Sequence, residues 1–409
     1  MTRHYVVPGR VELVGKHVDY AGGRSLTCAV DRALRVEAEA TNKPVLQVDA
    51  GPERGVAAIP LDRTAAPTAA SWSVYVAAVA RRIARDFPHF RCGVEVRISG
   101  NLPEGAGLSS SSALIVALGT ALADANDAKN DELWRREIPD ALARAEYFAA
   151  IETGAPYREF AGEEGVGVRG GAQDPIAIVC GEAGAMSEFS YLPPRLRRRV
   201  PWPSEYVLAI GVSGVHAVKT GNAQQQYNQA SEAMRALVRR WNAETGRRDE
   251  TVAAALESGP DAVDRLRHIA RSDASAEYLL PRLEQFREET ETIVPGVGDA
   301  LRVRDWDALG RLVDRSFALA TRALRNQVPE TGFLVRSARD RGAIAASAFG
   351  AGFGGAVWAM VLEERSERFI QEWRADYEGA FPSRASSAQW VVTRPSAPAH
   401  EEVANHLPG

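Results

Sequence analysis

Residues 103–114 read PEGAGLSSSSAL, and this stretch decides the fold class of the first half of the chain. Before it, VEVRIS at 94–99 alternates apolar and polar residues, which predicts a half-buried strand ending at Gly100. After the glycines, the run SSSSALIVALGTALADAND is rich in alanine and leucine, which predicts a helix capped by its serines. The unit is therefore a strand, a glycine loop and a helix.

The loop has the composition of a phosphate cradle. Gly105 and Gly107 let the backbone approach a ligand closely, and four serines follow where the free N–H groups and positive end of the helix would meet an anion. It is not a Walker A loop, because no Lys-Ser/Thr follows the glycines at the required spacing. An ordinary serine-capped helix after a glycine turn would give the same pattern, so the loop alone leaves both interpretations open.

Two other glycine clusters match the GxGxxG pattern of dinucleotide-binding folds. In that fold the glycines precede a helix, whereas those at 350–355 precede the β-like apolar run 356–362. The cluster at 165–170 follows the acidic residues AGEEG with no strand in front of it. The context of both clusters argues against a nicotinamide or flavin enzyme.

Length and composition predict two domains. The chain has 409 residues, of which 45% are hydrophobic and 25% charged, so it can bury a sizeable core. The prolines of RRRVPWPSEYVLAIGVSG favour a boundary near 195–205, which gives domains of 1–200 and 201–409. The mixture of elements predicts two α+β layers with the ligand site between them. A strand is expected at 206–211 and helices near 71–87, 139–151, 223–242, 260–295 and 305–325.

The charge balance argues against nucleic acid or a membrane as the main partner. The formal net charge is −4, which gives no overall attraction to phosphate backbones or anionic lipids, so a small neutral ligand fits better. The residues MTRHYVVPGR form no signal peptide, and no apolar run approaches the ~20 residues of a membrane helix. Three cysteines without a CxxC pair favour a reducing compartment, so we expect a cytoplasmic protein.

A third segment, PGRVELVGKHVDYAGG at 8–23, concentrates hydrogen-bonding side chains between apolar residues and a glycine turn. Arg10, Lys16, His17 and Asp19 are suited to a polyhydroxylated ligand. A polar hairpin without a ligand is the alternative interpretation of this segment.

Taken together, the segments resemble one family. GRVELVGKHVDYAGG resembles the galactokinase signature, PEGAGLSSSSA the phosphate motif of the GHMP kinases and AFGAGFGGAV their third motif, in the family's order. SWSVYVAAVARRI is similar to the helix near the adenine site, ARAEYF to the helix that bears a metal ligand, and RLRHIARS to a helix of the C-terminal domain. The resemblance covers essentially the whole chain. It implies an α+β, two-domain GHMP kinase fold, with an N-terminal ribosomal-protein-S5-domain-2-like domain, a C-terminal ferredoxin-like α+β domain and the active site between them.

The resemblance also implies a function. It predicts a kinase that uses ATP and Mg²⁺ to phosphorylate the anomeric hydroxyl of galactose or a related monosaccharide, acting as a monomer or homodimer. The residues that would bind ATP are Gly105, Ala106, Gly107, Leu108, Ser109, Ser110, Ser111 and Ser112. Ser111 and Glu146 would hold the metal, and Asp174 and Arg10 would be catalytic. The residues that would bind the substrate are Arg10, Lys16, His17, Asp19, Gly171, Asp174 and Tyr227.

Asp174 has two possible roles by this resemblance. It could accept the proton of the attacking hydroxyl or only orient it, while Arg10 would keep it ionised and help neutralise the transferring phosphoryl group. A local alternative is that Asp174, followed by Pro175, is the N-cap of a helix.

Departures from the family pattern affect the predicted substrate. Lys16 replaces a glutamate that usually contacts the sugar, and the stretch 149–165 lengthens the interval from Glu146 to Asp174, so a lid or a reshaped sugar wall is expected there. The alternatives to galactose are arabinose, an amino sugar, a heptose or, because of Lys16, an acidic sugar. A sensor that binds ATP and sugar without catalysis is a second hypothesis, which the retention of Arg10, Glu146 and Asp174 disfavours.

Overall fold

The computed structural model describes residues 2–103, 105–215 and 222–402. The strands are β1 (Thr2–Val14), β2 (Arg24–Thr41), β3 (Val45–Asp49), β4 (Val56–Pro60), β5 (Gly93–Gly100), β6 (Ala185–Ser190), β7 (Arg195–Pro201), β8 (Tyr206–Val212), β9 (Ala345–Ala348), β10 (Ala356–Leu362), β11 (Gln389–Thr393) and β12 (His400–Glu401).

The α-helices are α1 (Ser73–Asp86), α2 (Ser110–Ala125), α3 (Glu132–Glu137), α4 (Ala141–Thr153), α5 (Gln173–Cys180), α6 (Asn222–Thr245), α7 (Val252–Leu256), α8 (Ala262–Arg271), α9 (Ala276–Glu288), α10 (Val294–Val303), α11 (Trp306–Leu319), α12 (Pro329–Asp340) and α13 (Ser366–Ala380). Two π-helical segments, η3 (Glu289–Ile293) and η4 (Ala320–Leu324), continue α9 and α11. The short 3₁₀ helices are η1 (Asp19–Ala21), η2 (Ala128–Asn130), η5 (Glu363–Arg365) and η6 (Pro382–Arg384).

The first sheet is built on the long hairpin of β1 and β2. Its strands follow the order β12-β1-β2-β5-β3-β4, with β6 paired to the first part of β2 and β7 paired to β6. All these pairs are antiparallel except β3 with β5. The register of β1 against β2 shifts between Pro8 and Arg10, and such irregularities redirect the side chains that follow them.

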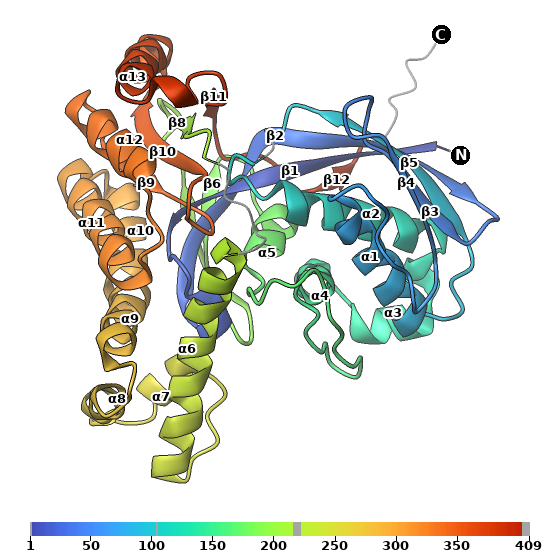
Figure 1. The fold of residues 1–409 in the computed structure, drawn as a ribbon, viewed down its shortest axis with the longest axis horizontal. Coiled ribbons are helices and arrows are strands. Elements are labelled where there is room, and N and C mark those ends of the chain that lie inside the picture. The colour runs from blue at the N-terminus through green and yellow to red at the C-terminus, as the bar shows by residue number, and fades with distance from the viewer. Residues whose placement is uncertain (1, 104, 216–221, 403–409) are drawn as a thin grey trace.

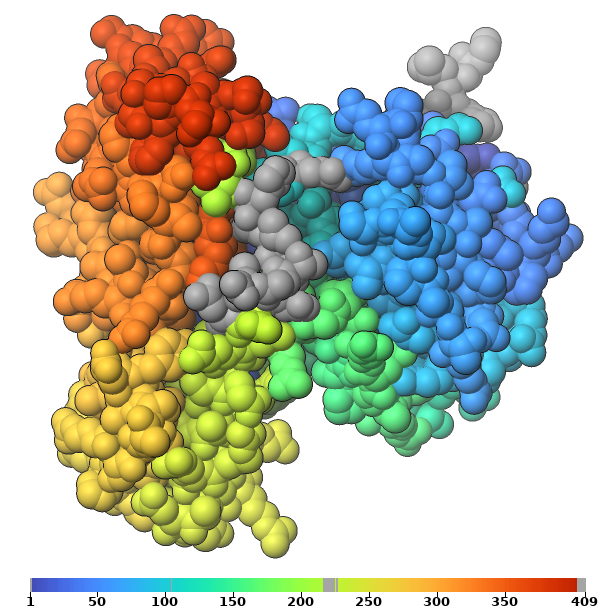
Figure 2. All heavy atoms as spheres, in the orientation of Figure 1, coloured from blue at the N-terminus to red at the C-terminus, as the bar shows by residue number. Residues whose placement is uncertain are grey.

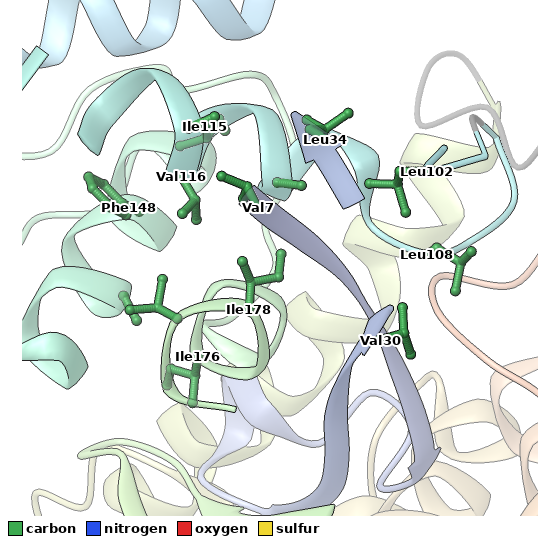
Figure 3. Close-up of a cluster of buried hydrophobic side chains, with 14 of the residues drawn as sticks. Val7, Val30, Leu34, Leu102, Leu108, Ile115, Val116, Phe148, Ile176 and Ile178 are labelled. Carbon is green, nitrogen blue, oxygen red and sulfur yellow. The ribbon is translucent and has the colours of Figure 1, made fainter. Parts of the chain in front are cut away.

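Helices α2 and α5 cover one face of this hairpin (Figure 1). Their apolar side chains meet those of β1 and β2 in the core, where Ile115 and Val116 of α2 lie near Val7, and Ile176 and Ile178 come from α5 (Figure 3). Leu108 of the glycine loop belongs to the same buried cluster. The core therefore anchors the loop between β5 and α2 against the hairpin.

The second sheet has the strand order β11-β8-β10-β9, and every neighbouring pair is antiparallel. In the second half of the chain, β8 is followed by a helical stretch, then by β9 and β10, then by helix α13 and finally by β11. This is the β-α-β-β-α-β arrangement of ferredoxin-like folds. The expected α+β fold with a ferredoxin-like C-terminal half is confirmed. Figure 2 shows the two halves as lobes, coloured blue to green and yellow-green to red.

Helical residues of the second half are hydrogen-bonded to the turn between β1 and β2. Arg282 of α9 is fully buried and donates hydrogen bonds to the His17 carbonyl and to the Tyr20 hydroxyl, at 3.0 Å for the second. The amide of Gln285 donates to the Lys16 carbonyl at 3.0 Å, and Glu289 accepts from the Gly15 N–H at 2.9 Å. These contacts fix the position of the turn relative to the helices.

Most of the elements expected from periodicity are present, including the strand at 94–99, the strand at 206–211 and the helices near 71–87, 139–151 and 223–242. The helical structure expected over 260–295 and 305–325 is also present, and the first stretch is divided between α8 and α9, where Asp273 accepts hydrogen bonds from the backbone and hydroxyl of Ser275. Strand β9 was not expected, because AASA lacks β-branched and aromatic residues. No helix of the described residues is long and apolar enough to cross a bilayer.

We expect Arg282→Met to lower the free energy of unfolding by about 2–4 kcal/mol, because it leaves the buried His17 carbonyl and the neighbouring polar groups without their donor. Urea unfolding followed by circular dichroism measures the change. The matched control is Arg239→Met, since Arg239 is largely exposed and pairs with Glu232 on the surface, and its effect should stay within about 0.5 kcal/mol. Equal effects of the two substitutions would contradict the anchoring role of Arg282.

Candidate active site

A cavity of about 250 Å³ lies where β1, the start of α2, the start of α5 and the loop after β9 meet. The residues that line it are Arg10, Glu12, His17, Asp19, Tyr75, Gly105, Gly107, Ser109, Ser110, Ser111, Glu152, Thr153, Val168, Gly170, Gly171, Gln173, Asp174, Tyr227, Gly350 and Ala351. All three segments singled out in the sequence contribute to it.

The glycine loop presents its backbone and serines to this cavity. Gly105 and Gly107 have positive φ angles of 63° and 71°, which glycine adopts without strain. Gly105, Gly107, Ser109, Ser110 and Ser111 line the cavity, whereas the side chains of Ala106 and Leu108 are buried in the core and Ser112 is buried behind Glu152. From Gly105 to Leu108, residues that face the cavity alternate with residues that anchor the loop, and the three serines that follow all line the cavity.

The serines do not cap α2 as the sequence predicts. Ser109, the residue before the helix, has a left-handed φ of 59° and no capping hydrogen bond, because its hydroxyl donates to Asp174. The first N–H groups of a helix have no partner within the helix. The start of α2 thus keeps backbone donors and its positive dipole end for an anion.

Arg10 and Asp174 form a bidentate ion pair beside the glycine loop. Nε and Nη2 of Arg10 donate to the two carboxylate oxygens of Asp174 at 2.6 and 2.9 Å, and Nη1 donates to the Gly107 carbonyl at 2.5 Å. Bidentate contacts of this kind fix both side chains. Arg10 is almost wholly buried, so its charge is compensated inside the protein by Asp174.

Asp174 is not the N-cap of α5. The helix begins at Gln173 after Ala172, and Asp174 lies in its first turn with the side chain directed to Arg10 and Ser109. A carboxylate in the first turn of a helix is stabilised by the dipole. The local alternative from sequence, a purely capping aspartate, is therefore wrong.

His17 and Asp19 line the cavity from the turn after β1. Nε2 of His17 lies 3.1 Å from the Ala351 carbonyl and so donates to it, while Nδ1 accepts from the Tyr20 hydroxyl at 3.2 Å. Burial, together with the positive charge of Arg282, lowers the pKa of His17 to about 4, so the ring is neutral near pH 7. Burial raises the pKa of Asp19 to about 6, although the backbone N–H of Gln173 donates to its carboxylate.

Gly171 and Tyr227 also line the cavity, next to these two residues. A Cβ at Gly171 would overlap the carboxylate of Asp19, so only glycine fits there. The Tyr227 ring lies 5.1 Å from the His17 ring, between centroids. The structure thus brings together Arg10, His17, Asp19, Gly171, Asp174 and Tyr227, as the sequence predicts.

Lys16 does not line the cavity, although its position in the segment 8–23 predicts that it contacts the substrate. Its side chain is buried, with Nζ donating to the Ser316 hydroxyl at 3.1 Å, and its charge acts on Glu12 and Glu289. A lysine can be buried here because carboxylates surround it. The basis for an acidic substrate therefore disappears.

Glu146 is also absent from the cavity, and Glu152 takes the place expected for it. Both lie on α4, but only Glu152 reaches the glycine loop, where the hydroxyls of Ser111 and Ser112 donate to its carboxylate at 3.3 and 2.7 Å. Glu146 is half-buried elsewhere, and burial raises its pKa to about 7. The long interval between Glu146 and Asp174 in the sequence could have indicated this correction, because the interval between Glu152 and Asp174 is shorter.

The long segment after α4 is a packed wall, and its ends reach the cavity. Arg81 of α1 donates to Glu163 at 3.2 Å and to the Gly165 carbonyl at 3.2 Å, which holds the segment against α1. Thr153, Val168 and Gly170 line the cavity. The segment therefore forms part of the cavity wall and is packed against α1.

A second cavity of about 210 Å³ adjoins the first and shares Tyr75, Gly105, Ser110 and Ser111 with it. Its other walls are mostly apolar and come from Leu34, Ala50, Arg54, Trp72, Ile98 and Leu114. An apolar pocket with two aromatic residues suits a flat heterocycle beside the phosphate cradle.

Sequence reasoning missed Glu12, Glu152 and Gln173 as cavity residues. Glu12 could have been found by strand periodicity, because it follows Arg10 by two positions on β1 and so lies on the same face. Nε2 of Gln173 donates a hydrogen bond to Oε2 of Glu12 at 2.5 Å. This contact could not have been found from the sequence, since it joins two distant parts of the chain.

Comparison with known proteins gives three matching family models. They are described as the galactokinase galactose-binding signature, over residues 3–39, the GHMP kinases N terminal domain, over 74–156, and GHMP kinases C terminal, over 299–379. A galactokinase of Thermococcus kodakarensis is 26% identical over 397 residues, covering 95% of this chain and 97% of that protein. A galactokinase of Chloroflexus aurantiacus is 28% identical over 383 residues, covering 90% and 86%.

Solved structures show the same architecture. Lactococcus lactis galactokinase complexed with galactose superposes with a TM-score of 0.80 at 22% identity, covering 98% of this chain and 95% of that one. Mevalonate kinase of L. major in complex with R-mevalonate gives 0.57 at 15% identity, with 96% of each chain covered.

We expect the ring signals of His17 to stay unchanged in NMR spectra between pH 8 and pH 5.5, because its pKa of about 4 keeps it neutral throughout. An unperturbed histidine, with a pKa near 6.5, would titrate in this range. Below about pH 6.5 the histidine of the unfolded chain binds a proton, whereas folded His17 stays neutral down to its pKa of about 4. The contribution of this group to the free energy of unfolding therefore decreases as the pH falls from about 6.5 to about 4. His17→Gln assigns the signal, and a midpoint above pH 6 would contradict the neutral ring.

Proposed function

Because this chain belongs to the GHMP kinase superfamily, in its galactokinase branch, we propose that it transfers the terminal phosphoryl group of ATP to the anomeric hydroxyl of galactose. The observation that carries the proposal is the ion pair of Arg10 and Asp174, which is hydrogen-bonded directly to the glycine loop through Gly107 and Ser109. This geometry sets a carboxylate and a guanidinium beside an anion site, as phosphoryl transfer requires.

The two adjoining cavities would hold the two parts of ATP. Trp72 and Tyr75 would bound the adenine, and the loop from Gly105 to Ser112 would hold the phosphates at the start of α2. The free backbone donors of the helix and its dipole favour the negative charge of the phosphates.

Ser111 and Glu152 fit a magnesium ion. Both present oxygen atoms to the cavity beside the loop, and Mg²⁺ prefers oxygen ligands with substrate phosphates completing its shell. No cluster of three or more histidine, cysteine or acidic side chains suited to a metal occurs in the described part of the chain, so a tight site made of protein groups alone is not expected there. When bound, Mg²⁺ would neutralise the charge on the phosphates.

Asp174 would orient the acceptor hydroxyl and can take its proton as the bond to phosphorus forms. Its position is set by Arg10, so little reorganisation is needed during the reaction. Arg10 would also offset negative charge on the transferring group, because it reaches both Asp174 and the loop carbonyl of Gly107.

A neutral sugar suits the remaining walls. Asp19 and Glu12 supply acceptors, His17 is neutral, and the one cation of the described lining, Arg10, is already paired with Asp174. An acidic sugar would therefore meet carboxylates without a free cation among the described residues. Galactose and its neutral relatives remain the substrates that the lining favours.

Other features of the proposal follow from the family and the composition. We expect the enzyme to work in the cytoplasm as a monomer or homodimer, with domains of about 1–200 and 201–409 on either side of the site. The C-terminal end of the described chain returns to the first domain, because His400 and Glu401 pair with β1.

The direct test is a panel of sugars assayed with MgATP by coupled ADP release. We expect galactose to be turned over, and Asp174→Asn to lower kcat at least about a hundredfold while the affinity for nucleotide stays nearly unchanged. Thermal unfolding of the variant with and without MgATP controls for misfolding. Binding of ATP and sugar without ADP release in the wild type would favour the sensor, and full activity of Asp174→Asn would remove this residue from the mechanism.

A matched pair of substitutions tests the metal position. We expect Glu152→Gln to raise the Mg²⁺ concentration for half-maximal activity roughly tenfold or more, because a ligand is lost, while Glu146→Gln leaves it unchanged. Both glutamates lie on α4, so effects on the helix itself should be similar. A larger shift with Glu146→Gln would restore the assignment expected from the sequence.

A further inference from the structure

Glu12 is one of the acidic residues of the cavity lining, and the proposed function assigns it no particular hydroxyl of the sugar. It follows Arg10 by two residues on β1, so both side chains lie on the same face of the strand and both line the cavity. Glu12 is only 3% exposed, yet it is an acidic residue in a cavity that Asp19 and Asp174 also line. A carboxylate is rarely buried in this way without a specific reason.

The carboxylate of Glu12 is only half satisfied. Oε2 accepts a hydrogen bond from Nε2 of Gln173 at 2.5 Å, whereas Oε1 is buried and has no hydrogen-bond partner among the described residues. A buried acceptor without a donor costs roughly 1–3 kcal/mol, and more if it is charged. A donor from a ligand in the cavity would remove this cost.

The cation with the largest effect on Glu12 lies outside the cavity lining. Burial raises its pKa to about 7, while Lys16, the Gln173 amide and Arg10 act in the opposite direction and Glu289 adds to the effect of burial. Lys16 does not line the cavity, and its ammonium donates to Ser316. Lys16 therefore favours the charged form of Glu12 but does not itself line the cavity.

We propose that Glu12 is a specificity-determining residue that accepts a hydrogen bond, through Oε1, from one ring hydroxyl of a neutral sugar. This inference rests on the proposed function, because it assumes a sugar in the cavity. A site with a buried acceptor should reject an analogue that lacks the matching hydroxyl, since the carboxylate would then remain unpaired.

The test compares sugar binding by wild type and Glu12→Ala. Galactose and its monodeoxy analogues, each lacking one hydroxyl, are titrated calorimetrically in the presence of Mg²⁺ and a non-hydrolysable ATP analogue. For the wild type, we expect one analogue to bind roughly tenfold or more weakly than galactose. For Glu12→Ala, galactose itself should bind weakly, and that same analogue should lose nothing further, because the group it lacks has no partner.

Glu289→Gln is the matched control. Glu289 is buried and interacts with Lys16 as Glu12 does, but it does not line the cavity. If Glu12 acts only through the charge of Lys16, Glu289→Gln should change the deoxy-sugar profile in the same way. We expect this variant to keep the wild-type profile, with a lower melting temperature. Glu12→Gln provides a variant closer in shape, should Glu12→Ala fail to fold.

The outcomes separate this inference from the proposed function. If galactose is bound and turned over but every analogue is affected equally in the wild type and both Glu12 variants, the role of Glu12 is overturned and the kinase remains. If Glu289→Gln reproduces the change seen in the Glu12 variants, Glu12 has a structural role only and the inference is wrong. If the wild type binds no sugar, both the inference and the proposed function fail.

Discussion

The ion pair of Arg10 and Asp174 is the interaction on which the geometry of the site depends. It joins three segments that are far apart in the chain, because Arg10 comes from β1, Asp174 from the first turn of α5 and the Gly107 carbonyl from the loop before α2. Three nitrogens of Arg10, both carboxylate oxygens of Asp174, the Gly107 carbonyl and the Ser109 hydroxyl are all hydrogen-bonded to one another, so moving any of these groups breaks a hydrogen bond of the network. The glycine loop, the carboxylate and the guanidinium therefore form one unit.

A second network sets the sugar side of the cavity. Arg282 donates to the Tyr20 hydroxyl, this hydroxyl donates to His17, and His17 donates to the Ala351 carbonyl in the loop between β9 and β10. The chain of hydrogen bonds links a helix of the second half, the turn of the first hairpin and the third glycine segment. It also explains why a histidine with a pKa of about 4 can be buried at this position: the neutral ring satisfies both of its nitrogens.

Sequence reasoning identified the correct segments but not always the correct residues within them. Glu146 and Glu152 lie on the same helix, and the motif ARAEYF pointed to Glu146, yet only Glu152 reaches Ser111 and Ser112. Lys16 lies in the signature and was expected to touch the substrate, yet its side chain turns away from the cavity to Ser316. Both differences concern side-chain direction, which depends on neighbours that are remote in the sequence.

The sequence by itself determined the fold class, most helices and strands, and the three segments that form the cavity, because periodicity, glycine and serine positions and motif order are local properties. It also predicted that Arg10 and Asp174 share one site, where the structure pairs them. Only the tertiary structure decided that Glu152 meets the loop, that Lys16 is buried between carboxylates and that Glu12 lines the cavity with an unpaired oxygen. The physical reason is that burial and hydrogen bonding are set by contacts between distant segments, and these arise only when the two sheets and their helices pack together.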